Sequence, residues 1–129
     1  MTYADVVAGV GAAMAAYAHA LDDGRTDDVL ATFCPDGGID MPGIGTHEGL
    51  DALRAAYERL LPRQPQRHLV MNTHVTEWDE HEATAVSDVV LLLRNDERWA
   101  VQAVGRYHDV LHHDGDAWHF HRRTAEFVF

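Results

Sequence analysis

The sequence contains no lysine, a single cysteine and a single serine. Without lysine, the chain can neither form a Schiff base with a carbonyl substrate nor supply the lysine of a phosphate-binding P-loop. Cys34 has no partner for an internal disulfide, which is typical of a protein from a reducing compartment. Ser87 lies in no nucleophile motif. The sequence therefore disfavours acyl-enzyme hydrolysis.

Positive charge is also scarce, with 10 arginines against 21 acidic side chains and a formal net charge of −11. Such a surface repels nucleic-acid phosphates and anionic membranes, so we expect neither as a partner. We find no run long and apolar enough to span a bilayer, and the alanine-rich stretch 6–21 lacks the basic start of a signal peptide. The 129 residues suit one domain, 1–129, and we expect a cytoplasmic protein.

Apolar residues at helical spacing predict three helices in the first half of the chain. The first ends near Gly24, because glycine commonly follows a helix. Thr26 is expected to cap the second helix, which Pro35 ends, and the third stops at Pro62. Residues 37–49 are expected to form a short strand and a turn. The apolar face of the first helix is formed by Val7, Val10, Met14, Tyr17 and Leu21.

In the second half of the chain, apolar and polar residues alternate, as they do in β-strands. We expect four strands, at about 67–78, 82–94, 98–112 and 117–128, with a two-residue hairpin turn at Asp114-Gly115. Helices followed by a long meander predict an α+β fold. In this fold, three N-terminal helices pack on a curved, mostly antiparallel sheet, which encloses a pocket.

Three polar residues stand out against this scaffold. Tyr17 lies on the apolar face of the first helix, where its hydroxyl needs a partner if it is buried. Asp22 ends the same helix, where a carboxylate opposes the helix dipole, and His68 opens the first long strand. Alone, Asp22 is explained by a solvated turn and His68 by a surface position. If the two meet, the carboxylate fixes the imidazole tautomer and makes a general base.

Histidine is abundant near the last turn, and histidine pairs on neighbouring strands can bind zinc or nickel. A two-residue loop would place His108 opposite His121. The alternate positions form a core face, so the histidines turn outward or into a subunit contact, and we expect no metal or other cofactor. That core face consists of Tyr107, Leu111, Trp118 and Phe120.

The whole pattern resembles the SnoaL-like branch of the NTF2-like superfamily, a cone-shaped α+β fold. Within it, the chain is most similar to scytalone dehydratase, bile-acid 7α-dehydratase and hexachlorocyclohexane dehydrochlorinase. The residues that carry the resemblance are Tyr17, Asp22, Gly43-Ile44-Gly45-Thr46-His47-Glu48-Gly49, His68-x-x-x-Asn72, Gly105-Arg106-Tyr107-x-Asp109 and Trp118-x-Phe120-x-x-Arg123.

The resemblance implies a His–Asp pair that removes a proton while a leaving group departs. It places the histidine at His68, the aspartate at Asp22, the dehydratase tyrosine at Tyr17 and the dehydrochlorinase arginine at Arg123. Strand parity would instead put Arg122 on the face of Trp118, unless a β-bulge intervenes. The residues expected to hold substrate are Asn72, Tyr107, Trp118 and Ile39.

The hypothesis from the sequence is a cofactor-independent lyase of the dehydratase type acting on a small, largely apolar carbonyl compound. An isomerase or polyketide cyclase would begin with the same proton abstraction, and a non-catalytic small-molecule binding module would share the pocket. The resemblance also implies a homo-oligomer, dimer or trimer, that associates through the outer face of the sheet.

Overall fold

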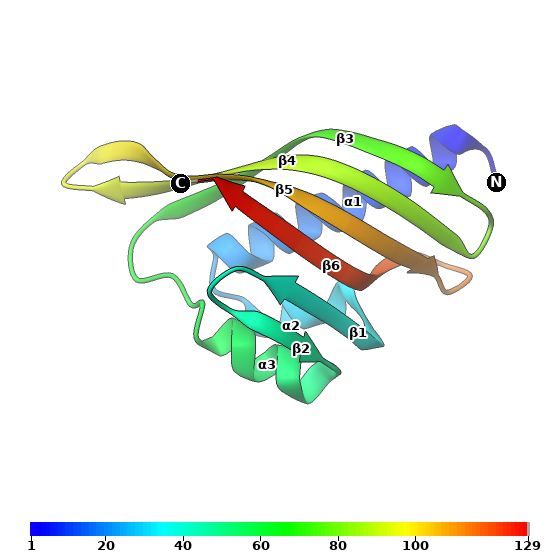
Figure 1. Cartoon of the computed structure of the whole chain (residues 1–129), viewed down its shortest axis with the longest axis horizontal. Helices are drawn as coiled ribbons and strands as arrows, with labels where there is room; N and C mark the ends of the chain where they lie inside the picture. Colours follow the sequence, from blue (N-terminus) through cyan, green and yellow to red (C-terminus); the bar gives the residue numbers. More distant parts are fainter. Residues whose placement is uncertain (129) are drawn as a thin grey trace.

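The computed structural model describes residues 1–128 and confirms the α+β architecture. A curved six-stranded sheet lies over the long helix α1, with the short helices α2 and α3 beside the smaller strands β1 and β2 (Figure 1). The elements are α1 (Tyr3–Asp22), α2 (Thr26–Ala31), β1 (Phe33–Met41), β2 (Gly45–Glu48), α3 (Leu50–Glu58), β3 (Gln66–Trp78), β4 (Glu82–Asn95), β5 (Arg98–His113) and β6 (Trp118–Val128).

Helix α1 begins with a capping box. The Thr2 side chain accepts a hydrogen bond from the Asp5 amide, and the Asp5 carboxylate accepts one from the Thr2 amide. Beyond its last residue the chain turns at Gly24, whose φ of 71° favours glycine. The predicted apolar face is confirmed from Val10 to Leu21, but Val7 is exposed and Val6 is buried in its place.

The stretch after α1 differs from expectation. Thr26 is the first residue of α2, and Arg25 stands at the cap position. Within residues 1–128 the Arg25 side chain makes no capping hydrogen bond, and its guanidinium instead donates to Asp28 at 2.6 Å. The helix ends at Ala31, well before Pro35, because Phe33 enters the sheet and pairs with Phe120 of β6. Here sheet pairing replaces the expected last turn of the helix, and Pro35 becomes part of β1.

The sheet has the order β2-β1-β6-β5-β4-β3. Strands β1 and β6 pair in parallel, and the other neighbouring pairs of strands within residues 1–128 are antiparallel. The four long strands follow the predicted bounds closely. The last turn is longer than predicted, because residues 114–117 separate β5 from β6 and His108 lies opposite Thr124 instead of His121.

Two irregularities decide which side chains point inward. In β6, Val110 pairs with Arg122 but Leu111 pairs with Phe120, so His121 is an extra residue, which places both Phe120 and Arg123 on the buried face. The sequence left Arg122 and Arg123 as alternatives for this face, and the β-bulge decides it for Arg123. In β3, the pairing shifts between Met71 and His74, and Asn72 adopts a φ of 55°.

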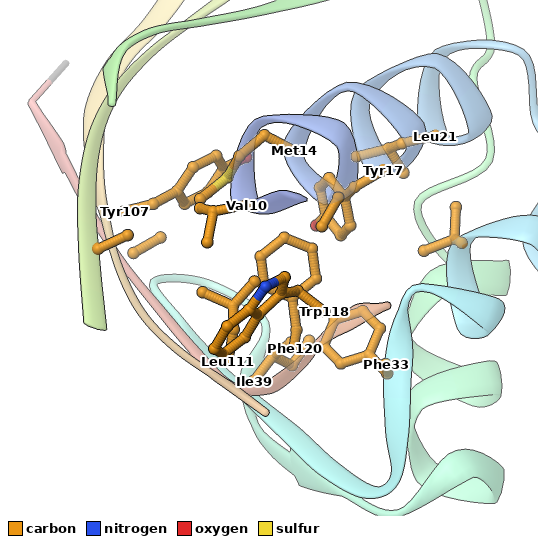
Figure 2. Close-up of a cluster of buried hydrophobic side chains, with 14 of the residues drawn as sticks. Val10, Met14, Tyr17, Leu21, Phe33, Ile39, Tyr107, Leu111, Trp118 and Phe120 are labelled. Carbon is orange, nitrogen blue, oxygen red and sulfur yellow. The ribbon is translucent and has the colours of Figure 1, made fainter. Parts of the chain in front are cut away.

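The core fills the space between α1 and the sheet. Met14, Tyr17 and Leu21 project from α1 toward the side chains of the sheet (Figure 2). Within residues 1–128, α1 is the one helix long and apolar enough to cross a membrane by length and composition, contrary to the expectation that no run qualifies. One face of it is nevertheless buried in this core, including Val6 and Val10. The cytoplasmic location stays a prediction.

Candidate active site

The structure brings Asp22 and His68 into direct contact. The imidazole Nδ1 of His68 lies 2.6 Å from Asp22 Oδ1, and the backbone amide of His68 donates a hydrogen bond of 2.7 Å to Oδ2 of the same carboxylate. The side chain of His68 is 12% exposed and that of Asp22 is 6% exposed. Both carboxylate oxygens of Asp22 therefore hold the histidine, one through its ring and one through its backbone.

Two elements far apart in sequence position this pair. Asp22 is the last residue of α1, and His68 is the third residue of β3, the strand that packs against that helix. Gln66, two residues before His68, adds a third hydrogen bond from its amide nitrogen to Asp22 Oδ1, at 3.2 Å. The pair is thus fixed where the end of the helix meets the start of the strand.

The charge state of Asp22 follows from these contacts. Partial burial alone raises the pKa of the carboxyl, but the hydrogen bonds from the side chain and backbone of His68 outweigh it and lower the pKa below its usual value. An ionised carboxylate only accepts hydrogen bonds, so Nδ1 of His68 carries the proton. The lone pair of the neutral ring is then on Nε2, which bonds no residue among 1–128.

His68 borders a cavity of about 270 Å³ between the end of α1 and the sheet. Its polar lining comes from Tyr17, Gln66, His68, Gln102 and Tyr107, and no arginine of the described chain lines it. The remaining lining is apolar and consists of Leu21, Met41, Pro42, Ile44, Leu60, Leu91, Ala103 and Phe127. A neutral ligand with one or two oxygen atoms matches such a surface.

Tyr17 brings a buried phenol to this cavity. Its hydroxyl shares a 2.6 Å hydrogen bond with the hydroxyl of Tyr57 on α3. Burial raises the pKa of Tyr17, of Tyr57 and of Tyr107, so all three phenols stay protonated at neutral pH. If Tyr57 donates to Tyr17, the Tyr17 hydroxyl is free to donate its proton to a ligand.

Arg123 is fully buried but does not line the cavity. Its Nε and Nη2 donate to the two carboxylate oxygens of Asp109, at 3.0 and 3.3 Å. Its guanidinium carbon lies 3.6 Å from the ring centre of Tyr107 and 4.3 Å from that of Tyr17. Burial raises the pKa of Asp109 to about 6, although Arg123 opposes that shift. Arg123 therefore lies behind the two cavity tyrosines and not at the cavity wall. Its contact with substrate stays a prediction.

Three further residues expected to hold substrate lie away from the cavity. Asn72 is exposed, because the irregularity in β3 turns it outward, and its amide donates to Asp88 at 2.8 Å. Trp118 packs on α1 at Gly9, and Ile39 is fully buried in the core without reaching the cavity. Of the four expected substrate contacts, the structure places only Tyr107 at the cavity wall.

Sequence reasoning missed Gln66, Gln102, Tyr57 and the role of Asp109. For two of them a signal was present. Gln66 stands two residues before His68, and Asp109 stands two residues after Tyr107, so strand alternation puts each on the same face as its neighbour. Tyr57 carries no such signal, because nothing in the sequence indicates its distance from Tyr17.

Sequence comparison identifies one family. The model of the SnoaL-like domain matches residues 3–124, nearly the whole chain. No curated protein matches the sequence significantly.

Solved structures share the fold over almost the full length. A protein from Novosphingobium aromaticivorans, provisionally assigned as a scytalone dehydratase, is 22% identical with a TM-score of 0.85, covering 100% of this chain and 89% of its own. A protein of unknown function from Mycobacterium tuberculosis is 23% identical with a TM-score of 0.85 and coverages of 99% and 77%. LinA is 18% identical with a TM-score of 0.83 and coverages of 97% and 87%. At these identities the likeness shows the fold alone.

Proposed function

Since this chain belongs to the SnoaL-like domain family, whose NTF2-like fold is shared by dehydratases and isomerases, we propose that it is a lyase of the dehydratase type. It acts without a cofactor on a small, largely apolar carbonyl compound that carries a β-hydroxyl group. One observation carries the proposal. The imidazole of His68 borders the cavity, and Asp22 holds its other nitrogen at 2.6 Å.

The reaction begins with proton abstraction. Nε2 of His68 takes the proton α to the carbonyl, and the electrons of the broken C–H bond move onto the carbonyl oxygen as an enolate forms. Asp22 stabilises the imidazolium that results, because its carboxylate lies against Nδ1. The hydroxyl of Tyr17 donates a hydrogen bond to the enolate oxygen.

Elimination completes the reaction. As the enolate collapses, a carbon–carbon double bond forms and the β-carbon–oxygen bond breaks. The proton held on His68 passes to the departing hydroxide, so the products are an unsaturated carbonyl compound and water. The base returns to its neutral form, and no oxidant, reductant or cofactor is consumed.

The cavity also indicates the kind of substrate. Its lining is mostly apolar, and the guanidinium of Arg123, which lies behind Tyr17 and Tyr107, is already paired with Asp109. Asp22 contributes negative charge beside the base. An anionic substrate would therefore lack a counter-charge and be repelled, whereas a neutral carbonyl compound is accommodated.

Elimination assays on β-hydroxy ketones of increasing hydrophobic size test the proposal. Formation of the conjugated product is followed by ultraviolet absorption. His68→Gln is expected to lower turnover by about 10²- to 10⁴-fold, the usual contribution of a general base. His74→Gln is the matched control, since His74 lies on the same strand outside the cavity lining and the variant should keep wild-type turnover.

Two alternatives predict other results in the same assay. An isomerase or cyclase would depend on His68 equally but give a product that retains the hydroxyl oxygen or closes a ring. A binding module, which the apolar lining also suits, would bind these compounds with no turnover. Either outcome would overturn the dehydratase assignment.

Self-association is a separate proposal. Apolar side chains are exposed on the outer part of the sheet, including Val101 at 62% and Trp99 at 47%. We infer that a dimer or trimer covers this face. Sedimentation equilibrium tests it, and a monomer at assay concentrations would contradict it.

A further inference from the structure

A cluster of metal-ligating side chains lies outside the cavity. Cys34 on β1, His112 on β5 and His121 on β6 each offer a ligand atom, and these atoms lie within 4.8 Å of one another. Each of the three follows a buried residue, and successive strand residues point to opposite faces, so all three lie on the outer face of the sheet. The buried residues that precede them are Phe33, Leu111 and Phe120.

The topology of the sheet explains why residues so distant in sequence meet. Strands β1, β6 and β5 are neighbours, and Phe33 pairs with Phe120 in parallel, so Cys34 and His121 follow side by side. The bulge at His121 disturbs the pairing with β5, and the rings of His112 and His121 stack with centres 4.1 Å apart.

His112 already has the partner that a metal-binding imidazole usually has. Its Nε2 lies 2.9 Å from Glu82 Oε2, on the neighbouring strand β4. A carboxylate in this position fixes the tautomer with the proton on Nε2 and leaves the lone pair on Nδ1. Metal-ligating histidines commonly use such an acid to hold the ring.

In His121 the feature that favours a metal ion is a ring nitrogen. Its Nδ1 is buried and finds no hydrogen-bond partner within residues 1–128. The nearest carboxylate, Oδ1 of Asp36, is 3.7 Å away, beyond hydrogen-bond distance. A buried nitrogen without a partner costs free energy, and a bound ion removes that cost.

Cys34 supplies the sulfur of the cluster. Its Sγ lies 3.8 Å from the backbone carbonyl oxygen of His119, on the strand that carries His121. When a metal–sulfur bond forms, the thiol gives up its proton to solvent.

We propose that Cys34, His112 and His121 bind a divalent ion of the zinc and cobalt type, with solvent or the Asp36 carboxylate, 3.7 Å from Nδ1 of His121, as the fourth ligand. One thiolate and two imidazoles select such ions over magnesium or calcium. Tetrahedral zinc needs its ligand atoms about 3.3–3.6 Å apart, so the cluster contracts and one ring turns out of the stack. The side chains of His112 and His121 are 39% and 35% exposed, which leaves room for that rotation.

Cobalt titration of the full chain tests this proposal without any activity assay. The chain is freed of any polyhistidine tag, stripped of metal and kept reduced. We expect one equivalent of Co²⁺ to produce the thiolate-to-cobalt charge-transfer band and the intense visible bands of tetrahedral cobalt, and Zn²⁺ to displace it. Cys34→Ser should abolish the charge-transfer band, and His121→Asn should weaken binding at least tenfold.

Two further variants sharpen the result. Glu82→Gln should weaken binding by about 10- to 100-fold, the usual effect of losing the acid behind a ligating histidine. His108→Asn is the matched control, because His108 pairs with Glu126 at 2.6 Å on the same face of β5 and belongs to no such cluster. Absence of a saturable one-equivalent signal, a charge-transfer band that survives in Cys34→Ser, or an equal loss in His108→Asn would overturn the proposal.

Discussion

The carboxylate of Asp22 holds His68 at two points, with Oδ1 at 2.6 Å from Nδ1 of the ring and Oδ2 at 2.7 Å from the backbone amide. This double attachment fixes both the orientation of the imidazole and the start of β3. The same aspartate therefore has a catalytic consequence and a structural one, and the two can be measured separately.

Asp22→Asn should lower the free energy of unfolding at neutral pH by about 1.5–3 kcal/mol, the value of hydrogen bonds to a charged group. The pKa of Asp22 is lowered in the folded protein, so its contribution is present above the unfolded pKa of about 4 and disappears as pH falls through the folded pKa. Urea unfolding from pH 3 to pH 7 should show the gap between wild type and variant closing at the acidic end. Asp23→Asn is the control, because Asp23 is exposed and its removal should change little.

Tyr17→Phe and Tyr57→Phe remove the same 2.6 Å hydrogen bond but differ in what faces the cavity. Each leaves one buried hydroxyl without its partner, so both should lower the free energy of unfolding by about 1–3 kcal/mol. Only Tyr17→Phe removes the donor beside the substrate, and its turnover should fall by about 100-fold, as on loss of an oxyanion-hole donor. Equal turnover in the two variants would show that Tyr17 has a structural role alone.

Arg123→Met should destabilise the fold strongly, by about 3–5 kcal/mol, because it leaves the buried carboxylate of Asp109 unpaired. Burial raises the pKa of Asp109 in the folded protein, and the loss of Arg123 raises it further. The folded variant therefore takes up a proton that the unfolded chain does not, and the penalty should be smaller at pH 5 than at pH 8. The double variant Arg123→Met/Asp109→Leu should recover most of the stability. A penalty independent of pH would contradict this account.

Two glycines in α1 provide a matched pair for thermal unfolding. A Cβ at Gly9 would lie 2.5 Å from Cδ1 of Trp118, whereas a Cβ at Gly11 meets no atom of the described chain within 4 Å. Gly9→Ala should therefore cost about 1–3 kcal/mol by overpacking. Gly11→Ala should instead stabilise the helix by about 0.5–1 kcal/mol. If both substitutions changed the free energy of unfolding in the same direction, that result would contradict the close contact between α1 and β6.

Much of the fold could be predicted because local pattern and tertiary structure agree. The alternation in the second half predicted strand bounds close to those observed. Whether Arg122 or Arg123 shares the face of Trp118 was left open by the sequence, and the bulge in β6 decides it for Arg123. The end of α2 could not be read from sequence. Pairing of Phe33 with Phe120, a contact across most of the chain, determines where that helix stops.

The site was predictable where residue type alone restricts the chemistry. An aspartate at the end of a helix and a histidine at the start of a strand form a general-base pair if they are in contact. The structure shows this contact between Asp22 and His68. Simple alternation puts Asn72 on the face of His68, whereas the structure exposes it, because β3 is irregular there and the positive φ of Asn72 is not visible in the sequence. The resemblance placed Arg123 at the substrate, and the pairing of Arg123 with Asp109 becomes evident only once β5 and β6 are paired.

Hydrogen–deuterium exchange at carbon tests the central claim most directly, since proton abstraction precedes every product. β-Hydroxy ketones are incubated in D₂O with the wild-type protein or with His68→Gln, and loss of the α-proton signal is followed by NMR together with any elimination. The account predicts exchange or elimination about 10²-fold or more faster with the wild type. A compound that binds in the cavity, yet loses its α-proton no faster with the wild type than with His68→Gln, would contradict it.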